Sequence, residues 1–303
     1  MSATRKIIVS FIVLVILGGA GVGIYFLISS DSLSSGGDNG QKDLDAIDLD
    51  ECLTAHNPDK YSWSTYNTCG ARRYVALTFD DGPNIQTTPD VLRDLESTQV
   101  VATFFVSPAV NGEATNEQCG LIREILKAGH QVASHSWNHR NFQDLTQEEM
   151  ARQLCQTKQW IYECAGDQVD KLSVTQFRPP YGTLTGDNAE YVTDFGYTLA
   201  GWNIDSGDAG TDTEDRLTTP QASLAKITSE FESNIREGNS AIILMHDGDY
   251  KDDGVKGLIP LLVNYFNQMN YVFVTGDQCH SDCQGFGVQI CEDSHTWPRF
   301  YEL

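Results

Sequence analysis

Short apolar runs alternate with amphipathic segments from Tyr74 to Thr275, and this alternation restricts the possible folds more than any other feature of the chain. The apolar runs are typical of buried strands, whereas the segments between them place apolar residues three or four positions apart, as helices do. About seven strands can be counted, at residues 74–79, 100–106, 131–136, 175–177, 197–202, 241–245 and 271–275. The sequence therefore predicts an α/β fold, a distorted or incomplete (β/α) barrel of about seven parallel strands.

The segments between the strands carry signals for the ends of helices. Thr88 and Pro89 start one helix, because proline is favoured in the first turn. Thr146 and Glu149 form a capping box that opens a long helix. Further helices are expected at residues 116–127, 187–195, 220–237 and 255–268.

An apolar run over residues 7–27 follows Arg5 and Lys6 near the N-terminus. As a helix it would span about 30 Å, the thickness of a bilayer core. We interpret residues 1–30 as a cytosolic tip and transmembrane signal-anchor, because secretory signal peptides have shorter apolar cores. The basic residues place the N-terminus in the cytosol, so the rest of the chain is expected in a lumen or outside the cell. A cleaved segment would instead give a secreted protein.

The remaining chain divides into three parts. Residues 31–51 are rich in Ser, Gly and Asp and predict a disordered stalk. Residues 52–276 form the predicted domain, and residues 277–303 form a C-terminal extension that contains cysteines.

Eight cysteines fit an oxidising compartment, where an even number suggests disulfides whose pairing the sequence alone does not give. The alternative for the last three is a zinc ribbon that includes Cys279, His280, Cys283 and Cys291. A net charge of −22 argues against a nucleic acid as partner, because phosphates are bound by an excess of Lys and Arg. A neutral or cationic partner fits this charge better.

Two adjacent carboxylates and two histidines follow predicted strands. Asp80 and Asp81 come at the end of the first strand, where Gly82 and Pro83 break it. The carboxyl ends of parallel strands are where such folds collect chemistry. His135 and His139 follow another strand, and their spacing of four suits a pair of metal ligands. One carboxylate and two histidines leave coordination positions open, which is typical of a catalytic metal.

Two further strand ends carry candidate catalytic groups. Arg178 precedes two prolines, which make a rigid turn that can aim a backbone N–H of the turn at a developing oxyanion. A simple proline bend is the alternative. His246 ends an apolar strand and is a candidate general acid, although a lone histidine there is usually structural.

These blocks resemble the polysaccharide deacetylase family, the NodB-homology domain, over about residues 74–276. The matching motifs are Thr78-Phe79-Asp80-Asp81-Gly82-Pro83, His135-Ser136-x-x-His139, Arg178-Pro179-Pro180-Tyr181-Gly182 and Leu244-Met245-His246. The resemblance implies that Asp80 is the general base and that Arg178 orients it. It also implies a metal held by Asp81, His135 and His139.

The same resemblance implies that His246 is the general acid and that the backbone N–H of Tyr181 joins the oxyanion hole. A fourth block of the family fits Trp202 to Asp208, but its final Trp is replaced by Ala209. Asp208 is still able to hold His246 in its charged form, since a carboxylate raises the pKa of a neighbouring histidine. The missing indole leaves open how the wall beside the acetyl group is made.

The activity implied is metal-dependent hydrolysis of N-acetyl groups from N-acetylglucosamine units of an extracellular polysaccharide. Chitin or chitooligosaccharides lead as substrates, ahead of peptidoglycan and acetylxylan. Zinc leads as the metal, and cobalt, nickel or manganese also suit these ligands. Two alternatives stay open: a carbohydrate-binding surface protein without turnover, which Ala209 alone supports, and a structural zinc site with four protein ligands.

Overall fold

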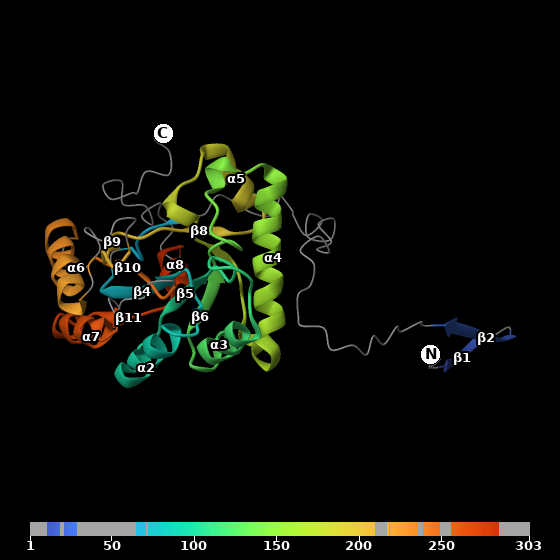
Figure 1. Ribbon diagram of the computed structural model, residues 1–303. Coiled ribbons are helices and arrows are strands. Elements are labelled where there is room, and N and C mark those ends of the chain that lie inside the picture. Colours follow the sequence, from blue (N-terminus) through green and yellow to red (C-terminus); the bar gives the residue numbers. More distant parts are fainter. Residues whose placement is uncertain are drawn as a thin grey trace, which may run out of the picture. The chain divides into compact units, whose positions relative to one another are not determined.

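The computed structural model describes residues 11–18, 21–28, 65–70, 72–209, 217, 219–235, 239–248 and 256–284. The chain divides into two compact units, Met1–Gln41 and Lys42–Leu303. Figure 1 shows the larger unit as a sheet of strands with helices around it.

The smaller unit contains two antiparallel strands, β1 (Phe11–Gly18) and β2 (Gly21–Ile28). The helix predicted over residues 7–27 is therefore wrong for the described part of this run, and the membrane anchor stays a prediction. The run is rich in β-branched residues, which favour strands, and its glycines weaken a helix. Among the residues described, no helix combines the length and the apolar character needed to cross a bilayer. The predicted stalk, residues 31–51, lies outside the described part of the chain.

The larger unit is built on a sheet of nine strands whose neighbours all pair in parallel. The strands are β3 (Thr65–Tyr66), β4 (Tyr74–Asp80), β5 (Thr103–Val106), β6 (Gln131–Ser134), β7 (Gln176–Phe177), β8 (Thr198–Ala200), β9 (Ile204–Asp205), β10 (Ala241–His246) and β11 (Val272–Phe273). Their order is β3-β8-β7-β6-β5-β4-β10-β9, and β11 pairs with β4. This confirms the predicted parallel α/β fold with an incomplete barrel. All seven predicted strands are present, and the two additional ones are the two-residue strands β3 and β9.

Helices form an outer layer beside the strands (Figure 1). They are α2 (Thr88–Thr98), α3 (Asn116–Lys127), α4 (Gln147–Ala165), α5 (Gly186–Asp194), α6 (Pro220–Asn234) and α7 (Leu258–Gln268). The last helix, α8 (Gly276–Gln284), lies on the opposite face of the sheet, where its Cys279 packs with Ala76 and Ile242. The predicted capping box of Thr146 and Glu149 is confirmed at the start of α4, and Thr115 and Gln118 form a second one at α3. These boxes satisfy backbone N–H groups that a helix start leaves without partners.

Strand β4 shows how the core sets the position of the polar residues. Leu77 and Phe79 are fully buried in the large core beneath the helices, whereas Ala76 belongs to a smaller cluster on the opposite face of the sheet. Successive side chains of a strand point to opposite faces, so Thr78 and Asp80 share the face of Ala76. The acid at the end of β4 is therefore directed away from the helices, towards the inside of the partial barrel.

Disulfides tie distant segments of the larger unit together. Cys69 is bonded to Cys279 of α8, which is 210 residues away, and Cys119 of α3 is bonded to Cys164 of α4. Cys155 is disulfide-bonded as well. The zinc-ribbon alternative is therefore wrong for Cys279. The C-terminal residues 285–303 lie outside the described part of the chain.

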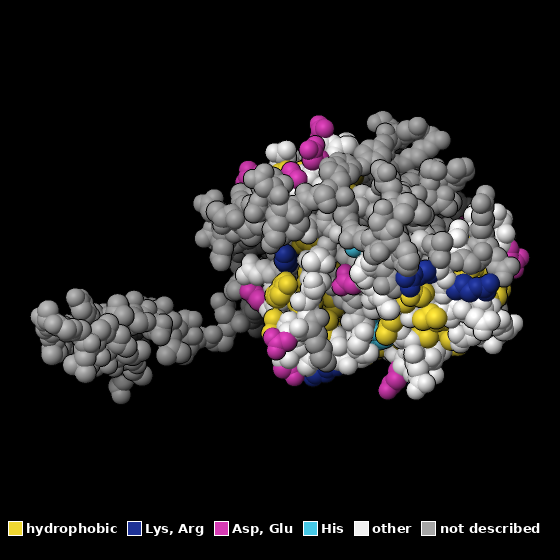
Figure 2. Space-filling view, turned by 180° about the vertical axis from the view of Figure 1, so that it is seen from behind, with side chains coloured by type: hydrophobic (Ala, Val, Ile, Leu, Met, Phe, Trp, Pro, Cys, Tyr) yellow, Lys and Arg dark blue, Asp and Glu magenta, His cyan; other side chains and the backbone are white. Residues whose placement is uncertain are grey.

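Acidic side chains are scattered over the face shown in Figure 2 rather than gathered in one patch. The described side chains of that face therefore form no single strongly charged surface.

Candidate active site

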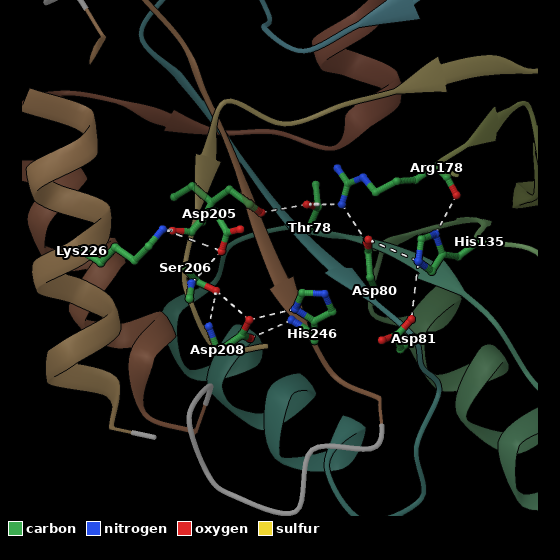
Figure 3. A network of polar contacts seen from close by, with 12 residues as sticks. Thr78, Asp80, Asp81, His135, Arg178, Asp205, Ser206, Asp208, Lys226 and His246 are labelled. Atoms are coloured by element: carbon green, nitrogen blue, oxygen red, sulfur yellow. Dashed lines mark hydrogen bonds and ion pairs between the residues drawn. The ribbon is translucent and has the colours of Figure 1, made fainter. Parts of the chain in front are cut away.

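The predicted site residues lie at the carboxyl ends of parallel strands. Asp80 and His246 are the last residues of β4 and β10, and they are partners in the register of the two strands. Register partners on adjacent parallel strands point to the same face, so the acid and the histidine share one pocket. Figure 3 shows Asp80 next to Arg178 and His135, with His246 and Asp208 on the other side.

Asp81, His135 and His139 come together as the sequence predicted. One potential ligand atom from each lies within 4.8 Å of the others. The Asp81 Oδ1 atom is 3.5 Å from His135 Nε2 and 3.3 Å from His139 Nε2. Ligand atoms of a tetrahedral zinc site lie about 3.3–3.6 Å apart. The Asp81 Oδ1 atom is buried and makes no hydrogen bond to the described residues, so a divalent cation fits this site.

The tautomer of His135 follows from its hydrogen bond. Its Nδ1 lies 2.6 Å from the backbone oxygen of Arg178, which can only accept, so Nδ1 carries the proton. The lone pair is then on Nε2, which faces Asp80 and Asp81. Burial lowers the pKa of His135 to about 3, with His139 acting in the same direction. The imidazole is therefore neutral and has the form that a metal ligand needs.

The loop of the two histidines is held by a side chain that the sequence reasoning missed. Gln153 of α4 accepts hydrogen bonds from the backbone N–H groups of Trp137 (2.9 Å) and Asn138 (3.2 Å). His139 has a φ of +59°, a strained value for a residue other than glycine. The only signal in the sequence was that Gln153, an amide, stands among the positions of α4 that face the core.

Arg178 positions the carboxylate of Asp80. The guanidinium is fully buried and donates to Asp80 Oδ1 at 2.7 Å and to Thr78 Oγ1 at 2.8 Å. Two backbone oxygens, of Ala200 and Gly201, accept its other hydrogen bonds. Burial raises the pKa of Asp80, and Arg178 opposes this rise. A carboxylate in this environment is more basic than one in water.

Asp208 is buried, His246 is partly buried, and the two side chains form a pair (Figure 3). Nδ1 of His246 lies 2.8 Å from Asp208 Oδ1, and the His246 backbone N–H donates to Asp208 Oδ2 at 2.8 Å. Burial by itself lowers the pKa of His246, but the Asp208 carboxylate, helped by Asp81 and Asp80, raises it to about 10. The imidazole is thus protonated at neutral pH and can donate a proton.

Tyr181 and Gly182 form the turn after Arg178. Tyr181 has a φ of +61° and an exposed side chain, and its ring lies 4.6 Å from that of His139. Gly182 also has a positive φ, and a Cβ atom there would lie 2.5 Å from the indole of Trp202. The turn therefore packs closely against the fourth sequence block and holds the Tyr181 backbone beside the metal ligands.

Asp247 is a second buried residue near the site that sequence reasoning missed. It accepts a hydrogen bond from Thr88 Oγ1 at 2.6 Å, and its backbone N–H donates to the Asp80 oxygen at 3.1 Å. Burial raises the pKa of Asp247 to about 7. A Cβ atom on Gly248 would lie 2.2 Å from that of Asp81. The loops after β4 and β10 are therefore in direct contact. The only sequence signal that Asp247 belongs to the site was its position directly after His246.

Asp205 has a different environment from Asp208, although both belong to the fourth block. Its carboxylate accepts from the backbone N–H of Gly207 at 2.7 Å and lies 3.8 Å from Lys226 Nζ. These contacts shape the loop that carries Asp208. Ala209, at the position of the family's final Trp, is partly buried.

Comparisons with known proteins identify the relatives of this chain. Residues 67–200 match the family model described as polysaccharide deacetylase. A peptidoglycan-N-acetylglucosamine deacetylase, PgdA, from Listeria monocytogenes is 30% identical over 73% of this chain, which spans only 42% of that protein. A chitooligosaccharide deacetylase from Sinorhizobium fredii is 32% identical over 59% of the chain and 74% of its own length. The solved chitin deacetylase from Colletotrichum lindemuthianum superimposes with a TM-score of 0.60 at 22% identity, over 79% of this chain and 97% of that one, and shows a shared fold.

Proposed function

The chain belongs to the polysaccharide deacetylase family, and on that premise we propose that it hydrolyses N-acetyl groups of N-acetylglucosamine units in a polysaccharide. The observation that carries the proposal is the convergence of three metal-ligand side chains with two separate proton-transfer pairs. Asp80 with Arg178 lies beside the metal ligands, and His246 with Asp208 lies at the adjacent strand end.

The amide of an N-acetyl group needs help at three points, because it is a poor electrophile with a poor leaving group. When bound at Asp81, His135 and His139, a divalent cation would polarise the acetyl oxygen and lower the pKa of a coordinated water. We assign zinc to this site; cobalt, nickel or manganese are the alternatives.

The residues of the chain supply the proton transfers. Asp80, oriented by Arg178, takes a proton from the attacking water. The Tyr181 backbone N–H stabilises the negative charge that develops on the acetyl oxygen. His246, which Asp208 keeps protonated, donates its proton to the departing amine. Asp80 must start without a proton and His246 with one. Arg178 favours the charged form of Asp80, against the effect of burial, and Asp208 favours the charged form of His246.

We further propose chitin or chitooligosaccharides as the substrate. Relatives are named for peptidoglycan and for chitooligosaccharides, so the choice depends on this chain. A net charge of −22 suits a neutral polymer whose deacetylated product is cationic. Disulfides at Cys69 and Cys119 favour an oxidising compartment, where such polymers are found.

The test is acetate release by the purified protein from chitin oligomers, peptidoglycan and acetylated xylan. We expect the highest kcat/KM on chitin oligomers, loss of activity with a chelator and recovery with zinc. Asp80→Asn should lower kcat at least about 100-fold, since general base catalysis contributes that much or more. Asp187→Asn, an exposed acid on α5, is the matched control and should change little. No acetate from any substrate with zinc present would refute the proposal.

Ala209 is the one observation that favours a second function, binding of carbohydrate without turnover. That alternative predicts oligosaccharide binding in the absence of acetate release. The Ala209→Trp variant distinguishes the deacetylase from the binding protein. An enzyme that lacks only the indole beside the acetyl group should gain activity in this variant.

A further inference from the structure

The loop after β4 holds the metal ligand Asp81 in an unusual backbone conformation. Asp81 has a φ of +72°, a value that residues other than glycine rarely adopt. A strained backbone of this kind persists only where the surrounding structure holds it in place. The contacts around Asp81 therefore decide where its carboxylate can point.

Two glycines let the loops after β4 and β10 approach each other around Asp81. A Cβ atom on Gly82 would overlap the carboxylate of Asp247. A Cβ atom on Gly248 would overlap the Cβ atom of Asp81. Each acid thus lies directly against the backbone of the glycine that follows the other acid, a close approach that only glycine permits. A displacement of Asp247 is therefore passed on to the backbone beside Asp81.

Two hydroxyl groups at the start of α2 hold Asp247. Thr88 Oγ1 donates to Asp247 Oδ2 at 2.6 Å, and Thr87 Oγ1 donates to the Asp247 backbone oxygen at 2.6 Å. Thr88 Oγ1 also accepts from the backbone N–H of Asn84, in the loop after β4, at 2.8 Å. The Asp247 backbone N–H donates to the Asp80 oxygen at 3.1 Å. Asp247 is therefore anchored both to α2 and to the end of β4.

The side chain of Asp247 is more polar than the packing of two loops requires. Asp247 is 2% exposed, and its Oδ1 atom makes no hydrogen bond to the described residues. Burial of a carboxyl group with an incomplete set of hydrogen bonds is unfavourable. Residues that depart from the rules of core packing in this way are expected at functional sites.

We propose that Asp247 is a positioning residue for the metal ligand Asp81. Packed against Gly82 and held by Thr88, it keeps the loop after β4 in the conformation that directs the Asp81 carboxylate at the two histidines. In that conformation Asp81 Oδ1 lies 3.5 Å from His135 Nε2 and 3.3 Å from His139 Nε2. This inference rests on the metal site of the proposed function and adds a residue that sets the affinity of that site.

The test is a zinc competition titration of the purified protein, together with the Tm of its chelator-treated form. Asp247→Ala removes the carboxylate and should weaken zinc binding about 10-fold or more, as the loss of a group that orients a metal ligand does. Asp247→Asn keeps the shape of the side chain and an oxygen that can accept from Thr88, so it should retain most of the wild-type affinity. Thr88→Val removes only the hydroxyl and should weaken zinc binding by less than Asp247→Ala. It carries the test if Asp247→Ala does not fold.

Matched controls exist for both residues. Asp94 is a partly buried acid of α2 whose Oδ2 accepts from the Gly257 backbone N–H at 2.8 Å, at the start of α7. Thr98, at the other end of α2 from Thr88, donates through its hydroxyl to the Asp94 backbone oxygen at 2.8 Å. Asp94→Ala and Thr98→Val should bind zinc as the wild type does, even where their Tm falls.

The outcomes separate this inference from the function on which it rests. A purely structural role of Asp247 predicts a lower Tm of the zinc-free protein with unchanged zinc affinity. That result in Asp247→Ala, or in Thr88→Val, would overturn the inference and leave the deacetylase function standing. Equal losses of affinity in Asp247→Ala and Asp247→Asn would also overturn it, because the charge and not the position of the side chain would then matter. No zinc binding by the wild type would overturn both the inference and the metal site.

Discussion

At the scale of single residues, the pair of His246 and Asp208 sets the expected response to pH. The pKa of His246 is raised to about 10, so its proton is present at neutral pH and is lost as pH rises towards 10. Asp208→Asn removes the charge that raises this pKa, while burial continues to lower it. We expect the alkaline limb of kcat/KM to move to lower pH by about two units or more, with reduced activity at pH 8. A pH profile of acetate release measures this shift.

Asp205→Asn is the matched control for that profile. Asp205 lies in the same sequence block but contacts Gly207 and Lys226 instead of His246. The alkaline limb of kcat/KM for Asp205→Asn should lie at the same pH as that of the wild type. Equal shifts in both variants would show that the loop, and not the charge of Asp208, governs the proton on His246.

The metal ligands predict a gain in stability with zinc. A ligand that binds only the folded state at one hundred times its Kd stabilises by about 2.7 kcal/mol. Zinc should therefore raise the Tm of the chelator-treated wild type, and His139→Ala should lose this increase. His280→Gln, on α8, is the control and should keep it. The same increase in His139→Ala would place the bound ion elsewhere.

Gly182 tests the close packing of the Tyr181 turn. Gly182→Ala combines a positive φ with a Cβ atom 2.5 Å from Trp202, whereas Gly129→Ala has a positive φ with nothing within 4 Å. The backbone strain alone costs of the order of 1–3 kcal/mol. We expect Gly182→Ala to lose more free energy of unfolding than Gly129→Ala in chemical denaturation, and to lose activity as well. Equal losses would mean that Trp202 moves freely.

At the scale of elements, helix α4 supports the loop of the two histidines through Gln153. Gln153→Leu leaves two backbone N–H groups without their acceptor, so the loop should lose its fixed shape. We expect zinc affinity to fall about 10-fold to 100-fold, as for other groups that orient metal ligands. Zinc competition titration measures this loss. Gln159→Leu, exposed on the same helix, should retain the affinity of the wild type.

The elements that sequence patterns predicted are those whose signal is local. Strand β4 is buried on both faces, so it is a continuous apolar run that stands out. The capping box at Thr146 fixed the start of α4 for the same reason. Strands β3 and β9 lie in short polar stretches without an apolar run and were not predicted, although β7 and β11, which also have two residues each, were. The apolar run over residues 7–27 has the length of a membrane helix, and length outweighed its many β-branched residues in the interpretation.

The residues of the candidate site also divide into those that local sequence patterns predicted and those that they missed. Asp80, Asp81, His135 and His139 were predicted because each follows a strand, and parallel strands bring their carboxyl ends to one edge. Gln153 and Asp247 were missed because their importance comes from contacts with loops far away in the sequence. Such contacts leave no periodic trace, so only the folded structure reveals them.

At the scale of the whole molecule, the Cys69–Cys279 disulfide closes a loop of about the entire domain. Longer closed loops restrict the unfolded chain more. Of the two described disulfides, this one should therefore contribute more to the free energy of unfolding. Replacing both cysteines by serine should lower the free energy of unfolding by about 2–5 kcal/mol. Chemical denaturation measures this loss, and zinc binding by the variant verifies that its native fold is intact. The Cys119→Ser/Cys164→Ser variant, which opens a 45-residue loop, should lose less. A reversed order would contradict the argument.

The same bond holds the Cα atoms of residues 69 and 279 only 4.6 Å apart. The first and last described segments of the barrel thus meet at one point, a condition under which circular permutation is often tolerated. A permuted chain could start in a surface turn and join the β/α units in a different covalent order. The strand ends that carry the catalytic groups would still have the same neighbours in space.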